Sequence, residues 1–91
     1  MDPRLEFFVA FLDRNKIRAT YQALAEAAEV SPRSVGSLLG DRCHLASWVV
    51  NGTTGRPTGY SSLEEHPHLL ANADIIRTGD DLIRRIKREP R

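Results

Sequence analysis

The sequence has little of several features that define large classes of protein. It contains one cysteine, Cys43, so no disulfide can link two parts of the chain, and no Cys/His cluster has the spacing of a zinc site. No apolar run approaches the roughly 20 residues of a membrane span, and residues 7–11, although apolar, do not form a signal-peptide pattern. These absences predict a cytoplasmic protein with no metal, no cofactor and no membrane partner.

An excess of charge of one sign is also lacking. Thirteen Lys and Arg residues against twelve Asp and Glu residues give a formal net charge of +1. Nucleic-acid-binding proteins usually carry a larger basic excess, so only the positions of the charges can favour such a function. The 91 residues, 41% of them hydrophobic, are enough for one globular domain with a thin core, residues 1–91.

The first half of the chain carries two consecutive helix patterns. Residues 3–14 are predicted to be helical because apolar side chains recur there at i, i+3, i+4 and i+7. Residues 15–19 are interpreted as a short polar connection. Thr20 is a candidate N-cap for a second helix over residues 21–29.

A third helix comes directly after the second. Ser31 is a candidate N-cap, Pro32 suits the first helical position, and Gly40 is placed to end a helix over residues 32–39. Two short helices joined by a tight turn and preceded by another helix form a helix-turn-helix pattern. Many helical bundles share this spacing, so the pattern needs support from the residues after Gly40.

A β-hairpin is predicted directly after these helices. Residues 48–51 are β-prone, residues 52–55 have turn chemistry, and residues 56–60 are expected to return antiparallel, with Pro57 confining that strand to an edge. A hairpin in this place is typical of a wing. The predicted fold class is therefore mainly α with a small β-hairpin: a winged helix-turn-helix.

The rest of the chain is expected to complete the core. Residues 67–71 are predicted as a short helix, and residues 75–76 as an extended or buried pair. An added C-terminal helix is predicted over residues 80–88, with its acidic residues in the first turn and its basic residues in the last, as the helix dipole favours. Leu82, Ile83 and Ile86 are expected to face the core.

If the partner is double-stranded DNA, the third helix is the expected recognition helix. Arg and Ser side chains can contact phosphates or base edges, and small or basic residues suit the tip of a wing. The residues predicted to contact DNA are Arg33, Ser34, Ser37, Arg42, Thr53, Thr54 and Arg56. A merely solvated helix face and an ordinary hairpin remain the alternatives.

Several short motifs, in their order, resemble one known family. The runs Thr-Tyr-Gln-Ala-Leu-Ala at residues 20–25 and Arg-Ser-Val-Gly at residues 33–36 resemble the C-terminal DNA-binding domain of alkylguanine-DNA alkyltransferases and of their non-enzymatic relatives, the alkyltransferase-like proteins. Residues 49–51 are similar to the strand after that family's active-site motif, and residues 59–61 to its substrate loop. The likeness covers residues 18–74 and implies a winged helix that binds duplex DNA in the nucleoid.

The resemblance also implies roles for single residues. Tyr21 matches a tyrosine that helps to rotate the target nucleotide out of the stack, and Arg33 matches an arginine that fills the gap. Trp48, Tyr60 and Ser61 would lie near a base pocket, where an aromatic face can stack on the base. Core packing is the alternative for Tyr21 and Trp48, and simple phosphate contact is the alternative for Arg33.

Departures from the family argue against catalysis. The enzymes need a thiolate in a Pro-Cys-His-Arg motif, whereas residues 45–48 read Leu-Ala-Ser-Trp, and Ala73 stands where the family has a glutamate. The connection before this stretch is also shorter, which alters any base pocket. Cys43 and His44 copy the Cys-His order, but they lie too close to the recognition helix to be buried by a strand. The chain is therefore expected not to be an enzyme.

The leading prediction is a non-enzymatic protein that binds duplex DNA, and its sharper form is recognition of a modified or extruded base in DNA repair. One alternative is an ordinary winged-helix transcriptional regulator or a nuclease specificity module. Another is a protein–protein adaptor, which the near-neutral net charge leaves open. A homodimer or a partner protein is compatible with the apolar first and last helices.

Overall fold

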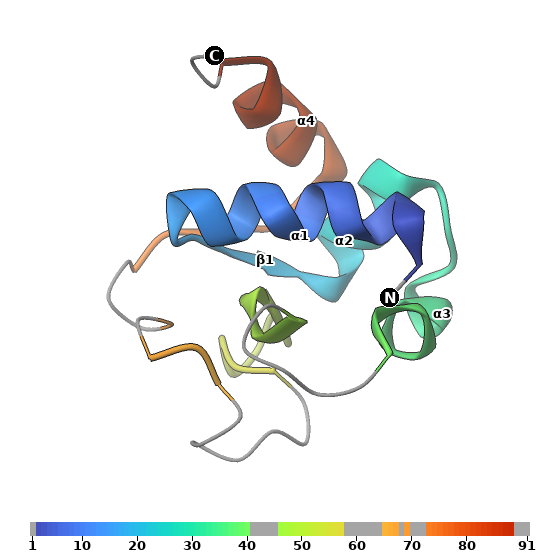
Figure 1. The fold of residues 1–91 in the computed structure, drawn as a ribbon, viewed down its shortest axis with the longest axis horizontal. Helices are drawn as coiled ribbons and strands as arrows, with labels where there is room; N and C mark the ends of the chain where they lie inside the picture. The colour runs from blue at the N-terminus through green and yellow to red at the C-terminus, as the bar shows by residue number, and fades with distance from the viewer. Residues whose placement is uncertain (1, 41–45, 58–64, 68, 70–72, 89–91) are drawn as a thin grey trace.

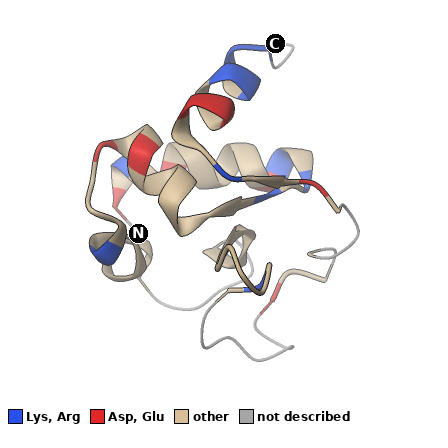
Figure 2. Cartoon of the chain, turned by 180° about the vertical axis from the view of Figure 1, so that it is seen from behind, with Lys and Arg blue, Asp and Glu red and all other residues tan. Residues whose placement is uncertain are grey.

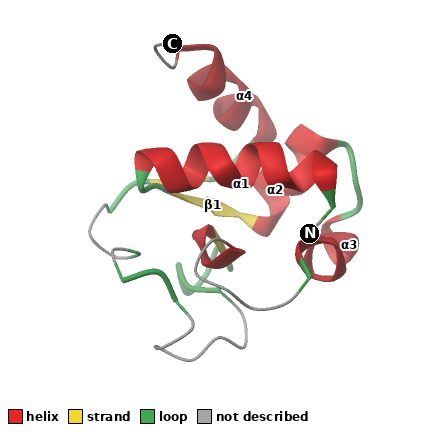
Figure 3. Cartoon of the chain, in the orientation of Figure 1, coloured by secondary structure: helices red, strands yellow, loops and turns green. Residues whose placement is uncertain are grey.

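A computed structural model describes residues 2–40, 46–57, 65–67, 69 and 73–88 (Figure 1). The chain is mainly helical, as the sequence predicted, and has a small sheet of parallel strands; Figure 3 shows the helices around β1. The elements are α1 (Pro3–Asn15), β1 (Arg18–Thr20), α2 (Tyr21–Ala28), α3 (Pro32–Leu39), a 3-10 helix η1 (Ala46–Trp48), β2 (Val49–Val50), β3 (Ile75–Ile76) and α4 (Gly79–Arg88).

Local capping chemistry sets the ends of α1 and the start of α2, and Thr20 is the N-cap predicted for α2. The Asp2 side chain accepts a hydrogen bond from the Arg4 backbone N–H at 2.8 Å, and Lys16 ends α1 in the left-handed conformation at φ 52°. The Thr20 hydroxyl accepts a hydrogen bond from the Ala23 N–H at 3.0 Å and begins α2. Each start therefore depends on residues within three positions of it.

The limits of α3 are also those predicted. Ser31 accepts a hydrogen bond from the Arg33 N–H at 3.3 Å, Pro32 occupies the first turn, and Gly40 ends the helix at φ 77°. Val35 is fully buried and Leu39 nearly so, which places this side of the helix in the core.

The sheet was only partly predicted. Its strand order is β2-β1-β3, with both pairs parallel, and Ala19 lies opposite Val49 on one side and Ile76 on the other. The prediction of a polar connection over residues 15–19 is wrong for residues 18–19. These residues belong to β1, which is the central strand and is wholly buried. A strand of three residues is too short to show a periodic pattern, and both of its partners lie far along the chain.

The predicted wing also differs from the structure. The backbone of Val49 and Val50 pairs with β1, so this apolar pair lies in the core and does not project as one arm of a hairpin. The chain then turns, with the Asn51 N–H donating to the Arg56 carbonyl at 2.9 Å. Residues 56–57 are not a strand, and residues 58–60 of the predicted return lie outside the described residues.

The core is centred on α2, which packs against α1, α3, α4, β1 and β2. The fully buried apolar side chains include Leu5, Val9, Leu12, Leu24, Val35, Trp48, Val49, Ile76 and Leu82. Leu69 is buried, but most of the helix predicted over residues 67–71 lies outside the described residues. Within the described part of the chain, no helix has the length and apolar character needed to cross a bilayer.

Candidate nucleic-acid interface

The α2–α3 unit is built so that one side of α3 stays at the surface. Glu29 ends α2 in the left-handed conformation at φ 58°, and the Val30 N–H donates to the Ala25 carbonyl at 3.0 Å, which closes the turn. Leu24 of α2 and Val35 of α3 are both fully buried in the same core cluster. The opposite side of α3 therefore points away from the protein.

The exposed side of α3 carries small residues and one cation. Arg33, Gly36 and Ser37 are exposed, Ser34 is half-buried, and the helix contains no acidic residue. Within the described residues, the Arg33 guanidinium makes no hydrogen bond and no ion pair, although the Arg33 backbone is held by Ser31. The predicted outward positions of Arg33 and Ser37 thus agree with their exposure, whereas Ser34 is only partly exposed.

Gly36 is a residue that the sequence reasoning did not single out. A Cβ built on Gly36 would meet no atom of the neighbouring structure within 4 Å. A glycine inside a helix is less stable than alanine by about 1 kcal/mol, and nothing in the described protein needs the space that it leaves. A glycine within an otherwise helical pattern was the available signal.

The C-terminal turn of α3 is fixed by the start of α1. The Asp2 N–H donates to the Leu38 carbonyl at 2.8 Å, which satisfies one of the free carbonyls at the end of the helix. Asp2 is held in turn by Arg4, whose Nε lies 3.2 Å from the Asp2 Oδ1. The Arg4 side chain, by donating hydrogen bonds, lowers the pKa of the Asp2 carboxyl. The orientation of α3 is thus set at both of its ends.

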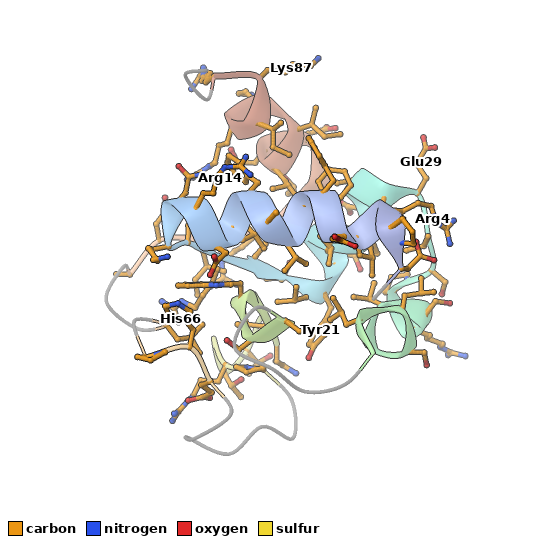
Figure 4. All side chains as sticks on the ribbon, in the orientation of Figure 1. Arg4, Arg14, Tyr21, Glu29, His66 and Lys87 are labelled. Carbon is orange, nitrogen blue, oxygen red and sulfur yellow. The ribbon has the colours of Figure 1, made fainter. Side chains whose placement is uncertain are left out.

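Tyr21 is half-buried and packs partly against the core. Figure 4 places it at the end of β1, between α3 and η1. Tyr21 therefore begins α2 with its side chain partly buried and partly exposed.

Trp48 is a core residue. Its side chain is 0% exposed, and its Nε1 donates to the Asp13 Oδ1 at 2.9 Å. The His66 ring packs on it with a centroid distance of 4.7 Å. In this structure no face of the indole is available for stacking on a base. Trp48 therefore packs in the core, which was the alternative to a place in a base pocket.

The turn after β2 is held by two arginines, Arg18 in β1 and Arg77 directly after β3. The Nη1 of Arg18 donates to the Gly55 carbonyl at 2.8 Å, and the Nη1 of Arg77 donates to the Gly52 carbonyl at 3.0 Å. Burial, with a smaller contribution from Arg77, lowers the pKa of Arg18. Gly55 adopts φ +71°, a conformation that glycine reaches without strain. The turn is thus rigidly anchored to the sheet.

Thr53 and Thr54 are exposed at the tip of this turn, whereas Arg56 is already engaged. The Arg56 guanidinium binds Glu65 through both carboxylate oxygens, at 2.7 Å (Nη2–Oε1) and 3.1 Å (Nε–Oε2). These hydrogen bonds raise the pKa of Arg56, and Glu65 is only 9% exposed. The Arg56 guanidinium is therefore paired within the protein, with about half of the side chain exposed.

The remaining predicted site residues, Arg42, Tyr60 and Ser61, lie outside the described residues, as does the Cys43–His44 pair. Among the residues that the structure does describe, no group of three or more His, Cys, Asp and Glu side chains is arranged to hold a metal ion. No protein-family model, no curated protein and no solved structure matches the chain.

Proposed function

We propose that the chain is a non-enzymatic protein that binds duplex DNA through the exposed side of α3. The observation that carries this proposal is the open space at Gly36 in the middle of that side. A glycine at this exposed helical position is less stable than alanine by about 1 kcal/mol, and it leaves the backbone open to close approach by a partner. A DNA groove whose walls approach the α3 backbone closely is such a partner.

Arg33 supports the same partner. It is exposed, lies one helical turn before Gly36, and makes no hydrogen bond or ion pair through its side chain with the described protein groups. An arginine offers five N–H donors that can bind a phosphate or the edge of a guanine. The absence of acidic residues from α3 leaves this charge undiminished along the helix.

The neighbouring small side chains fit this picture. Ser34 and Ser37 have short hydroxyl groups that can donate to phosphate oxygens without holding the helix away from the groove. Thr53 and Thr54, exposed at the tip of the anchored turn after β2, would take the place of a wing. In Figures 1 and 2 this turn and α3 both lie below α1, on the side of the molecule away from α4.

The sharper form of the proposal is recognition of a modified or extruded base, which the resemblance to alkyltransferase-like proteins implies. Tyr21 at the start of α2 and Arg33 on α3 match, in type and in order, the two residues to which the resemblance assigns this step. Trp48 gives no support, since it is fully buried. An ordinary DNA reader with the same helix, such as a transcriptional regulator, is the alternative.

Two substitutions on α3 test the DNA interface. Gly36→Ala should raise the free energy of unfolding by about 0.5–1 kcal/mol and yet weaken duplex binding, because the new methyl group fills the space needed by the groove. Arg33→Ala should weaken binding by roughly 1–3 kcal/mol if the side chain reads a base. Arg88→Ala on α4 removes the same charge away from α3 and is the matched control.

The measurement is a fluorescence-anisotropy titration of plain, methylated and alkylated duplexes at two salt concentrations. Affinity should fall as salt rises, because phosphate contacts release counterions. If Gly36→Ala and Arg33→Ala both bind DNA like the Arg88→Ala control, α3 is not the interface.

Base extrusion and catalysis need separate measurements. A 2-aminopurine placed at the target position should brighten on binding if the base leaves the stack, and an ordinary reader should leave it unchanged. The proposal that the chain is not an enzyme is tested by incubating it with an alkylguanine-containing oligonucleotide and then measuring its intact mass. An alkyl adduct on Cys43 would contradict it.

A further inference from the structure

The outer face of α4 is not covered by any described part of the chain. Gly79 and Leu82 on its inner face are buried, and α4 packs there against α2 and β3. The outer face carries four residues that together line a shallow hollow on the surface, and we call them the α4 face: Asp80, Ile83, Arg84 and Lys87.

Ile83 lies in the middle of the α4 face and does not occupy the core position predicted for it. It is 36% exposed and, with Phe7, is one of two large apolar side chains that are exposed within the described residues. Helical geometry explains the correction, because Leu82 and Ile86 already define the inner side and Ile83 is rotated about 100° from Leu82. A single exposed isoleucine is common on protein surfaces, so the arrangement of the charged side chains around Ile83 carries the argument.

The charges of the α4 face complement those of a second copy placed antiparallel to it. Asp80 is at the start of the helix and Lys87 near its end, and both are equally far from the midpoint between Ile83 and Arg84. Figure 2 shows the same polarity, with acidic residues at the base of α4 and basic residues toward its end. A two-fold axis through that midpoint would bring each Asp80 opposite Lys87 of the second copy.

The centre of such a pair is also compatible. Each Ile83 would lie against the aliphatic part of Arg84 in the second copy, while the guanidinium of Arg84 stays near its own Asp81, 3.9 Å away. A parallel arrangement would instead place like charges together, which is unfavourable. The pattern therefore selects one orientation.

We propose that the α4 face binds the same face of a second copy of this chain, in antiparallel orientation, to form a two-fold homodimer. α4 has ten residues and spans only about 15 Å, so the buried area is at the low end for specific interfaces and the dimer is weak and concentration-dependent. In Figures 1 and 2, α4 lies above α1 while α3 lies below it, so the dimer leaves both α3 helices free. This assembly does not depend on the proposed DNA function.

Charge exchange tests the pairing directly. Sedimentation equilibrium of the DNA-free protein over a wide concentration range should show a monomer–dimer equilibrium. Asp80→Lys and Lys87→Asp should each raise the dissociation constant about tenfold, because each creates two repulsive contacts per dimer. An equimolar mixture of the two variants should dimerise again, since opposite charges then face each other once more at both ends of the interface.

The controls separate pairing from folding. Both sites are exposed, and circular dichroism and thermal melts verify that each variant is folded. Glu6→Lys on α1 makes the same charge change as Asp80→Lys outside the α4 face and should leave the dissociation constant unchanged. A wild-type chain that stays monomeric at its solubility limit overturns the proposal. So does a mixture of the two α4 variants that associates no better than either alone, and so does wild-type association that appears only when duplex DNA is present.

Discussion

The backbone N–H of Gly79 donates to the Oε1 of Glu26 at 2.7 Å, so a side chain from α2 caps the first turn of α4. The two helices also approach each other closely at this point, because a Cβ on Gly79 would lie 2.5 Å from the Glu26 Cβ and 2.8 Å from the Ala27 nitrogen. The sequence alone suggests that α4 is an addition to a winged domain. The contact shows instead that α4 is docked on the central helix of the fold.

Gly79→Ala should destabilise the protein by about 1–3 kcal/mol, because the added methyl group has no room between α4 and the α2 backbone. Urea denaturation monitored by circular dichroism measures the change. Gly36→Ala is the matched control, since the same substitution in open space should stabilise the fold. If Gly79→Ala and Gly36→Ala shifted the free energy of unfolding in the same direction, the close contact at Gly79 would not explain the effect of Gly79→Ala.

The Glu26 carboxylate should make stability depend on pH. The Gln22 side chain donates a hydrogen bond to Glu26 and thereby lowers the pKa of Glu26 in the folded protein. The hydrogen bond from the Gly79 N–H lowers it further, by a smaller amount. Because this pKa is lower in the folded than in the unfolded protein, the charged carboxylate stabilises the fold at pH values above the unfolded pKa, near 4.3. This stability is lost as the pH falls through the folded pKa.

Glu26→Gln keeps an acceptor for Gly79 but has no charge to titrate. Its free energy of unfolding should therefore lie below that of the wild type at pH 7, and the difference should shrink as the pH is lowered toward about 3. Urea titrations of both proteins at several pH values measure this difference. Acid effects from other carboxyl groups, such as Asp2, cancel between the two. A difference that stays constant with pH would rule out the charged cap.

Asp13 should be needed to satisfy the buried indole of Trp48. Asp13→Ala leaves the Nε1–H of Trp48 without its acceptor 2.9 Å away, and the expected loss is about 1–3 kcal/mol. Asp13→Asn retains a side-chain oxygen and should restore most of that loss. Because Trp48 is the single tryptophan of the sequence, its emission spectrum reports the same contact, and equal spectra for the Ala and Asn variants would contradict the assignment.

The Arg56–Glu65 pair should be asymmetric in its energetic effect. Arg56→Ala leaves the carboxylate of Glu65, which is 9% exposed, without its bidentate partner, and the expected cost is about 1–3 kcal/mol. Glu65→Gln removes the charge that needs a partner and should cost less, since the remaining guanidinium is half-exposed to water. Thermal unfolding of both variants measures their losses of stability. A larger loss for Glu65→Gln than for Arg56→Ala would contradict this prediction.

The local sequence was sufficient where a structure depends on near neighbours. Asp2, Thr20 and Ser31 each bond to a backbone N–H two or three residues ahead, so the helix starts were predictable from short motifs. The exposure of Arg33 was predictable in the same way, because Val35 and Leu39 orient the whole helix.

The tertiary structure decided every feature that depends on residues far apart in the chain. β1 is a strand only because Val49 and Ile76 pair with Ala19 from opposite sides. The three residues of β1 alone carry no pattern that predicts this pairing. In the same way, distant contacts bury Trp48 and engage Arg56, and open space surrounds Gly36. Hydrogen bonds within a helical turn are encoded in adjacent residues, whereas burial and pairing arise only when remote segments meet.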